Sequence, residues 1–246
     1  MSGGDIAGAT GRRIVLWRHG RTHYNLEERF QGQLDTPLDD IGKEQATAGA
    51  RLLSRLRPAR LVTSDLARAS QTAAALHRLC GLPAIEDPRL REHDVGPWAN
   101  LTRDQVAARF PAAYGDWRTG ACPSDWEQPR DLARRALAGV TTALGNLGEG
   151  ETLIVVSHGG TIRAVIGSLL GIDAEEWWKL GALDNAHWAV LEETSRGWAL
   201  AGYNVGAQRS RDASPSQRPL SYAPAEDDGG GDVAIPAHLD QRRSHA

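Results

Sequence analysis

Arg18 and His19 stand directly after a short apolar run, Arg13 to Trp17 (RIVLW). The run is short and contains β-branched and aromatic residues, which is typical of a buried strand that ends where polar residues begin. A guanidinium at such a strand end could bind an anion, and a neutral imidazole could attack one as a nucleophile. His19 is therefore our candidate nucleophile.

A second histidine, His158, occupies the same kind of position. It follows the run from Glu151 to Val156, the strongest strand prediction in the chain, and precedes Gly159 and Gly160. The pattern from 161 to 170 then predicts a helix. A lone histidine is more often structural than catalytic, but a glycine turn at a helix N-terminus is a favourable place to bind an anion. We therefore include His158 in the site.

Arg68 is the third candidate, because it also follows a predicted strand. That strand covers Arg60 to Thr63, and Ser64 is expected to cap a helix that runs to about Leu79. The cap places Arg68 near the first turn of this helix. Ligands of open α/β sheets bind outside the carboxyl ends of the strands. We therefore expect Arg68 to lie close to His19.

Together these side chains would form a compact cationic cage for a dianionic phosphoryl group. Its members are Arg18, His19, Arg68 and His158, with Asn25 as a neutral hydrogen-bond donor. Neighbouring arginines lower the pKa of an imidazole, which keeps it neutral and able to attack phosphorus. The predicted chemistry is phosphoryl transfer to His19.

The remaining pattern alternates helices and strands. The further elements are a helix over 41–56 with Asp39 or Asp40 as its cap, a strand over 84–86, an amphipathic helix with Leu132, Val140, Leu144 and Leu147 on one face, and strands over 187–192 and 198–201. Such alternation is typical of an α/β fold. We predict a three-layer α/β/α sandwich with a mostly parallel central sheet.

Composition limits the partners. The 246 residues contain 28 basic and 31 acidic residues, a net charge of −3, which gives no broad attraction to nucleic acid or to an anionic membrane. The N-terminus lacks the apolar run of a signal peptide, and no later apolar stretch is long enough to span a membrane. We expect a cytoplasmic protein that acts on a small-molecule phosphomonoester. The oligomeric state stays open, and a homodimer is compatible with the sequence.

The chain divides into three parts. We expect a flexible N-terminus over 1–11, one catalytic domain over 12–207, and a disordered tail over 208–246, which is rich in Ser, Pro, Asp, Gly and Arg. Cys80 and Cys122 have no nearby Cys or His at metal-ligand spacing. We therefore predict reduced thiols and no metal site.

The residues around His19 resemble the RHGxTxxN signature of the histidine phosphatase superfamily. The matching segment is Leu16-Trp17-Arg18-His19-Gly20-Arg21-Thr22, followed by Asn25. Three more blocks follow in the order of the family: Ser64-Asp65-Leu66-Ala67-Arg68-Ala69-Ser70-Gln71-Thr72-Ala73, Leu90-Arg91-Glu92 and Val156-Ser157-His158-Gly159-Gly160. Four ordered blocks are hard to obtain by chance. The resemblance covers roughly Arg12 to Ala207.

For the matching positions the resemblance implies a phosphoglycerate mutase-like fold and specific roles. His19 would be the nucleophile and Glu92 the proton donor. The implied substrate-binding residues are Arg18, Asn25, Gln31, Arg68, His158 and Gly159. No metal and no cofactor are implied. The residues themselves leave two alternatives open: Glu92 could form a surface ion pair, and Gln31 could be a solvated loop residue.

Two segments resemble one branch of the superfamily more closely. Gln31 to Leu38 (QGQLDTPL) and Asp184 to Trp188 (DNAHW) look like the glucosyl-3-phosphoglycerate phosphatases of actinobacteria. This implies a phosphoglycerate-type or sugar-linked phosphomonoester, with a loop from Trp98 to Trp126 along the leaving-group side. The frequent Gly-Glu-Ser of the family appears here as Trp126-Glu127-Gln128, and its Trp-Glu-Gly as Trp98-Ala99-Asn100.

Two other functions are weighed against a phosphatase. A phosphoglycerate mutase would use the same histidine and glutamate, but those enzymes usually carry Arg-His-Gly-Glu-Ser, where this chain has Arg21-Thr22. A non-catalytic phospholigand-binding scaffold is disfavoured by the intact His19 and Glu92. The other histidines match no motif and receive no catalytic role; they include His23, His77, His93 and His187.

Overall fold

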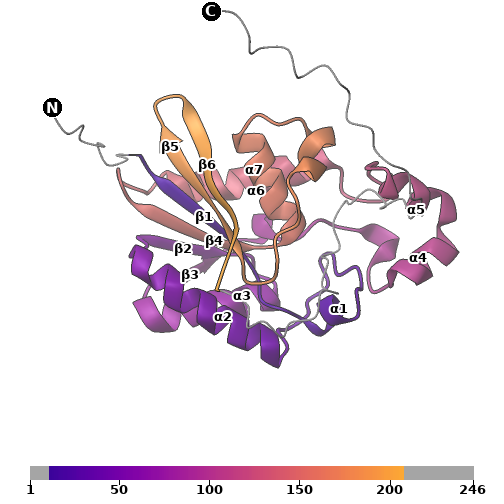
Figure 1. Ribbon diagram of the computed structural model, residues 1–246, viewed down its shortest axis with the longest axis horizontal. Coiled ribbons are helices and arrows are strands. Elements are labelled where there is room, and N and C mark those ends of the chain that lie inside the picture. The colour runs from indigo at the N-terminus through magenta and orange to yellow at the C-terminus, as the bar shows by residue number, and fades with distance from the viewer. Residues whose placement is uncertain (1–10, 208–246) are drawn as a thin grey trace, which may run out of the picture.

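A six-stranded sheet forms the centre of the computed structural model, which describes residues 11–207 (Figure 1). Its order is β3-β2-β4-β1-β5-β6. The strands are β1 (Arg13–Arg18), β2 (Arg60–Thr63), β3 (Ala84–Glu86), β4 (Thr152–Ser157), β5 (Trp188–Thr194) and β6 (Gly197–Val205). The first four run parallel, and β5 and β6 form an antiparallel hairpin at one edge. The predicted mostly parallel sheet is confirmed.

Helices cover both faces of the sheet. They are α1 (His23–Leu26), α2 (Asp40–Leu53), α3 (Ala67–Cys80), α4 (Arg103–Arg109), α5 (Pro111–Arg118), α6 (Pro129–Leu144) and α7 (Gly159–Leu169). Single turns of 3-10 helix lie at Ser54–Leu56, Pro88–Leu90 and Gly96–Trp98, and a longer one lies at Ala174–Lys179. In Figure 1, α2 and α3 lie against one face, and α6 and α7 against the other. The three-layer sandwich is therefore confirmed.

Alternate residues of the central strands supply two separate cores. In β1, Ile14 and Leu16 pack with α6 and α7, whereas Val15 and Trp17 pack with α2 and α3. This is the two-residue period of a strand that is buried on both faces. All four side chains are at most 1% exposed. The strand that leads to His19 is therefore held firmly from both sides.

A third, aromatic cluster lies away from the sheet. It consists of Phe30, Val95, Trp98, Val106, Trp117 and Trp126. The predicted loop from Trp98 to Trp126 is wrong in part, because this segment contains α4 and α5. Thr102 caps α4 in a capping box with Gln105, and α5 begins with Pro111, so helix-start signals were present in the sequence.

Three predicted helix ends also differ. Ser64 does not cap α3: Leu66 occupies the cap position, and the Ala67 N–H donates to Asp35 Oδ1 over 2.6 Å. The α7 helix starts at Gly159, two residues earlier than expected, and Leu147 lies beyond the end of α6. Of the two predicted caps of α2, Asp39 occupies the cap position. The predicted flexible N-terminus covers residues 1–11, of which only residue 11 is among the described residues. The predicted disordered tail, 208–246, lies outside them.

Helix α2 touches the segment after His19 at a glycine. A Cβ on Gly42 would lie 2.0 Å from Arg21 O, so even one methyl group forces the backbone apart. We expect Gly42→Ala to lower the free energy of unfolding by about 1–3 kcal/mol. On helix α5, no described atom lies within 4 Å of a Cβ on Gly115. Gly115→Ala should therefore raise stability by up to about 1 kcal/mol through helix propensity. Urea unfolding measures both variants, and equal effects would contradict the close contact.

Candidate active site

Three neighbouring strands bring the predicted residues to one edge of the sheet. The backbone continues its pairing past the strands: His19 N–H donates to Ser157 O over 3.0 Å, and Ser64 N–H to Val156 O over 2.9 Å. The rings of His19 and His158 are consequently 5.1 Å apart, centre to centre. Residues separated by more than a hundred positions in sequence thus share one small volume.

His19 is buried in a form that suits a nucleophile. Its side chain is 2% exposed, and its Nδ1 lies 2.7 Å from Gly20 O. Burial, followed by the charges of Arg68 and Arg18, holds the pKa of His19 well below its usual value. The ring is therefore neutral at neutral pH, and its Nδ1 must carry the proton in order to donate to the carbonyl. The lone pair is then on Nε2.

Arg18 is a second buried side chain at the end of β1. Its Nη1 donates to Leu183 O, whereas its Nε is buried and has no hydrogen-bond partner within residues 11–207. A Cβ on Gly159 would lie 3.6 Å from this Nε. A buried guanidinium N–H without an acceptor is costly. The positive charge of Arg18 also favours an anion near this end of β1.

Arg68 joins two parts of the site. Its guanidinium donates to Gly32 O over 2.8 Å, to Leu34 O over 2.7 Å and to His158 Nδ1 over 3.2 Å. Burial lowers the pKa of Arg68 to about 10, so it stays charged at neutral pH. The hydrogen bonds of Arg68 therefore connect helix α3 to the turn that begins at Gly32, at the edge of the pocket.

His158 lies behind this arginine. It is fully buried, with Nδ1 accepting from Arg68 and Nε2 placed 2.9 Å from Ser64 Oγ. Burial, followed by the charge of Arg68, holds the pKa of His158 well below its usual value. Both ring nitrogens have protein partners, and His158 does not line the pocket in the described part of the chain. Its role as a direct phosphate ligand therefore stays a prediction.

Asn25 and Gln31 each have their amide oxygen engaged by the protein. Asn25 Oδ1 accepts from Thr22 N–H over 3.0 Å, and Gln31 Oε1 accepts from Thr36 Oγ1 over 2.8 Å. Both residues line the pocket, and Gln31 is 8% exposed, which favours a site residue over a solvated one. With the oxygens engaged, the two amide NH₂ groups are oriented to donate to an anion.

Glu92 is held at the first turn of α7. Its Oε2 accepts from Gly160 N–H over 3.2 Å, and its Oε1 accepts from the N–H groups of Thr161 over 3.1 Å and His93 over 2.8 Å. A Cβ on Gly160 would lie 2.7 Å from Oε1, so a larger residue at this position would displace the carboxylate oxygen. The helix N-terminus is thus complementary to the Glu92 carboxylate. The geometry does not match the alternative of a surface ion pair.

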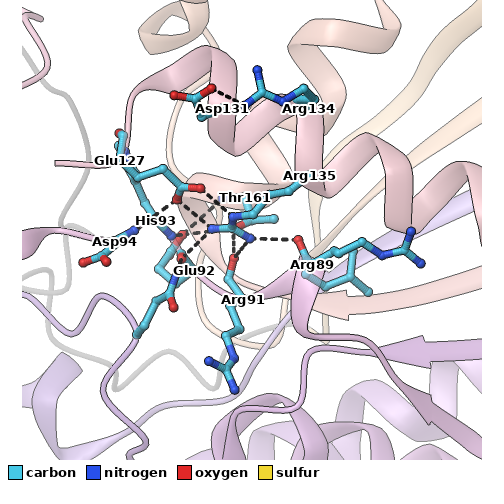
Figure 2. Close-up of polar contacts among 12 residues, drawn as sticks. Arg89, Arg91, Glu92, His93, Asp94, Glu127, Asp131, Arg134, Arg135 and Thr161 are labelled. Atoms are coloured by element: carbon cyan, nitrogen blue, oxygen red, sulfur yellow. Dashed lines mark hydrogen bonds and ion pairs between the residues drawn. The ribbon is translucent and has the colours of Figure 1, made fainter.

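Another arginine, Arg135 of α6, fixes the backbone that carries Glu92 (Figure 2). Arg135 donates to the carbonyl oxygens of Arg89, Arg91 and Glu92 over 2.7–2.8 Å. It also forms a bidentate pair with the Glu127 carboxylate over 2.6 and 2.8 Å. These contacts use all five guanidinium N–H groups. Sequence analysis gave Arg135 no role.

These residues surround a pocket of about 100 Å³. Of the predicted site residues it is lined by Arg18, His19, Asn25, Gln31, Arg68, Glu92 and Gly159. Further lining residues, for which we predicted no individual role, include Phe30, His93, Trp117, Trp126, Arg163 and Leu183. Arg163 could have been found, because it lies three and four positions after the two glycines and therefore on the same helix face. Leu183 carries no local signal.

Between residues 11 and 207, no group of three or more His, Cys, Asp or Glu side chains is placed to hold a metal ion. In the same range, none of the helices has the length and apolar character needed to cross a membrane.

Comparison with known proteins places this pocket in a class of α/β enzymes that act on phosphate groups. The pattern of the histidine phosphatase superfamily (branch 1) matches residues 14–206. A glucosyl-3-phosphoglycerate phosphatase of Mycolicibacterium vanbaalenii is 39% identical over 220 residues, which cover 82% of this chain and 98% of that protein. A probable phosphoglycerate mutase of Yersinia pestis is 32% identical over 198 residues, 78% of this chain and 90% of its own.

A solved structure agrees with these relatives. A mycobacterial glucosyl-3-phosphoglycerate phosphatase in complex with VO3 has a TM-score of 0.74 and is 37% identical, over 79% of this chain and all of that chain. The chain belongs to the histidine phosphatase superfamily. The predicted phosphoglycerate mutase-like fold is confirmed.

The two buried imidazoles should make stability fall in acid. His19 and His158 have lowered pKa values in the folded state and regain about 6.5 on unfolding. Below about pH 6.5 the unfolded chain therefore takes up protons that the folded chain excludes. The free energy of unfolding should drop by about 1.4 kcal/mol per pH unit for each group, until pH reaches its folded pKa. Urea unfolding between pH 7.5 and 5.5 measures this slope.

His158→Asn should flatten that slope, whereas His23→Asn should leave it unchanged, because the His23 side chain is 68% exposed. The same slope in all three proteins would contradict the proposed origin of the acid sensitivity.

Arg135 offers a matched test of the Glu92 support. Arg135→Met leaves one carboxylate and three carbonyl oxygens without their donor, and should lower the free energy of unfolding by about 2–4 kcal/mol. The next residue, Arg134, is 77% exposed and pairs with Asp131. Arg134→Met should change stability by less than about 0.5 kcal/mol. Chemical unfolding of both variants checks this, and an equal cost would show that the Arg135 contacts add nothing specific.

Proposed function

We propose that this chain is a phosphatase that hydrolyses a small phosphomonoester through a phosphohistidine on His19, with Glu92 as proton donor. One observation carries the proposal: the neutral, buried imidazole of His19 lines the same pocket as Arg18 and Arg68. Such a pocket attracts an anion and offers it a nucleophile.

The proposed reaction has two displacement steps at phosphorus. In the first, the Nε2 lone pair of His19 forms the N–P bond while the bond from phosphorus to the ester oxygen breaks, and Glu92 donates its proton to that leaving oxygen. In the second, Glu92 takes a proton from water, the water oxygen forms a bond to phosphorus, and the N–P bond breaks. Inorganic phosphate leaves, and both His19 and Glu92 return to their starting states.

Electrostatics support this division of roles. Arg18 and Arg68 supply positive charge at the pocket, and the amides of Asn25 and Gln31 can donate to equatorial phosphate oxygens. These groups are in place before substrate arrives, so little reorganisation is needed during the reaction. Between residues 11 and 207, the Glu92 carboxylate accepts from the first turn of α7 and from the His93 N–H, and from no arginine side chain.

The substrate that we propose is a phosphoglycerate or sugar-linked phosphoglycerate, such as glucosyl-3-phosphoglycerate. Support comes from two relatives with that activity in their names, at 39% and 37% identity. A phosphoglycerate mutase is the alternative favoured by the relative at 32% identity. A mutase would return the phosphoryl group from His19 to bound substrate instead of water.

We further infer a cytoplasmic enzyme that needs no cofactor and acts apart from nucleic acid and membranes. The net charge of −3 supports this inference.

Phosphate release from a panel of esters tests the function. With glucosyl-3-phosphoglycerate, 3-phosphoglycerate and p-nitrophenyl phosphate, we expect release by the wild type in the presence of a chelator. His19→Ala should lose at least about 1,000-fold, because no other group attacks phosphorus. His23→Ala is the matched control and should retain wild-type rates. Isomerisation of 3-phosphoglycerate without release would identify a mutase, and binding without either reaction would identify a scaffold.

The role of Glu92 has its own signature in the same panel. Glu92→Gln should slow release from the sugar-linked ester by about 100- to 10,000-fold, because an alkoxide leaves slowly without a proton. The p-nitrophenolate ion leaves without protonation, so that substrate should lose much less. Glu44→Gln, on the exposed side of α2, is the control. Equal losses with both substrates would remove Glu92 from the role of proton donor.

A further inference from the structure

A second cavity adjoins the phosphate pocket. Its volume is about 280 Å³, and it shares His93, Gly160 and Arg163 as lining residues with the phosphate pocket. The two spaces therefore meet at the first turns of α7, beside Glu92. The leaving oxygen of a bound ester would lie close to Glu92, so the organic part of the substrate has to extend from this point.

The size of the phosphate pocket supports a second compartment. At about 100 Å³ it falls below the roughly 300 Å³ at which pockets for drug-sized ligands begin. A phosphoryl group fits this space, but a phosphoglycerate that carries a hexose does not. The neighbouring cavity of about 280 Å³ supplies the missing volume.

One wall of the cavity is a fixed indole. Trp177 is 8% exposed, and its Nε1 donates to Ile172 O over 3.0 Å. It packs directly on α7, where a Cβ on Gly167 would lie 2.2 Å from the same nitrogen. Trp178 also lines the cavity, but it is 43% exposed, an unusual state for a large aromatic side chain.

Polar groups complete the walls. Gln128, Arg130 and Glu175 line the cavity, and Arg163 stands where the cavity meets the phosphate pocket. Arg163 is 8% exposed and lies near enough to Arg18 for their charges to repel. Aromatic surfaces with a few polar groups are typical of small-molecule sites, and they are complementary to a sugar ring, which has apolar faces and a polar edge.

We propose that this cavity, formed by Trp177, Trp178 and the first turns of α7, binds the sugar ring of a sugar-linked phosphoglycerate, while Arg163 binds its carboxylate. Arginine suits the second role, because its planar fork matches a carboxylate. The proposal rests on the proposed function, and it adds where substrate selectivity arises.

The test is a ratio of two specificity constants: kcat/KM for glucosyl-3-phosphoglycerate divided by kcat/KM for p-nitrophenyl phosphate. Both substrates are measured on the same preparation, so a partly unfolded variant leaves the ratio unchanged. Trp178→Ala removes an exposed wall and should lower the ratio about three- to tenfold through a higher KM for the sugar-linked ester. Arg163→Lys, which keeps the charge but loses the fork, should lower it about tenfold by the same route.

A filling variant gives an independent measurement. Ala121 is exposed at the edge of the cavity, and Ala121→Trp should occlude it and lower the ratio at least tenfold. Ala199→Trp is the matched control on the exposed edge strand β6 and should retain the wild-type ratio.

The outcomes separate this proposal from the proposed function. If the wild type releases phosphate from p-nitrophenyl phosphate but not from the sugar-linked ester, the proposed substrate and the cavity assignment are both wrong. If the wild type cleaves the sugar-linked ester and all three cavity variants keep its ratio, the cavity assignment is overturned and the phosphatase function stands.

Discussion

The burial of four nitrogen-rich side chains in one small volume is the constraint on which the rest of this structure depends. Arg18, His19, Arg68 and His158 are at most 7% exposed. Desolvation and mutual repulsion oppose such a cluster. The imidazoles respond by remaining neutral, whereas the guanidinium groups have no such option. The arginines must therefore find acceptors in the backbone or in a bound anion.

The fold meets this constraint with backbone carbonyl groups. Arg68 has acceptors in the turn at Gly32 and Leu34, and Arg18 has one at Leu183. Arg18 Nε has no partner in the described part of the chain, and the Arg18 side chain lines the pocket that a phosphate would fill. Binding of an anion there would place negative charge beside Arg18 and Arg68.

Glu92 is positioned by a separate set of contacts. Its carboxylate accepts from the first turn of α7, and Arg135 fixes the carbonyl groups on either side of it. Glu127 pairs with Arg135 and offsets part of its charge. The backbone that carries Glu92 is therefore held by contacts that do not involve Arg18 or Arg68.

The sequence predicts where the buried arginines and histidines lie but predicts the surroundings of Glu92 poorly, and both outcomes have one physical reason. His19, Arg68 and His158 follow apolar strands, so local pattern together with the rule for strand ends in α/β sheets locates them. The cap of α3 was mistaken because Asp35, a distant residue, satisfies Ala67 in place of Ser64. Leu183 and Arg135 act through tertiary contacts with no local signature. Helices α4 and α5 had capping signals, but they pack in the aromatic cluster and not on the sheet.

The residues at the central sheet and the residues of the outer walls of the pocket are packed in different clusters. Arg18 lies on β1 and His19 follows it directly, so the two cores of the central sheet hold this side of the pocket rigidly. Trp117 and Trp126, which line the pocket, and Trp177, which lines the neighbouring cavity, belong to other clusters. Substitutions in those clusters can reshape the walls without moving His19 or Arg68, because the clusters are packed separately from the sheet. A change of substrate therefore requires no change in the phosphoryl-transfer machinery, and the walls are where selectivity has to be measured.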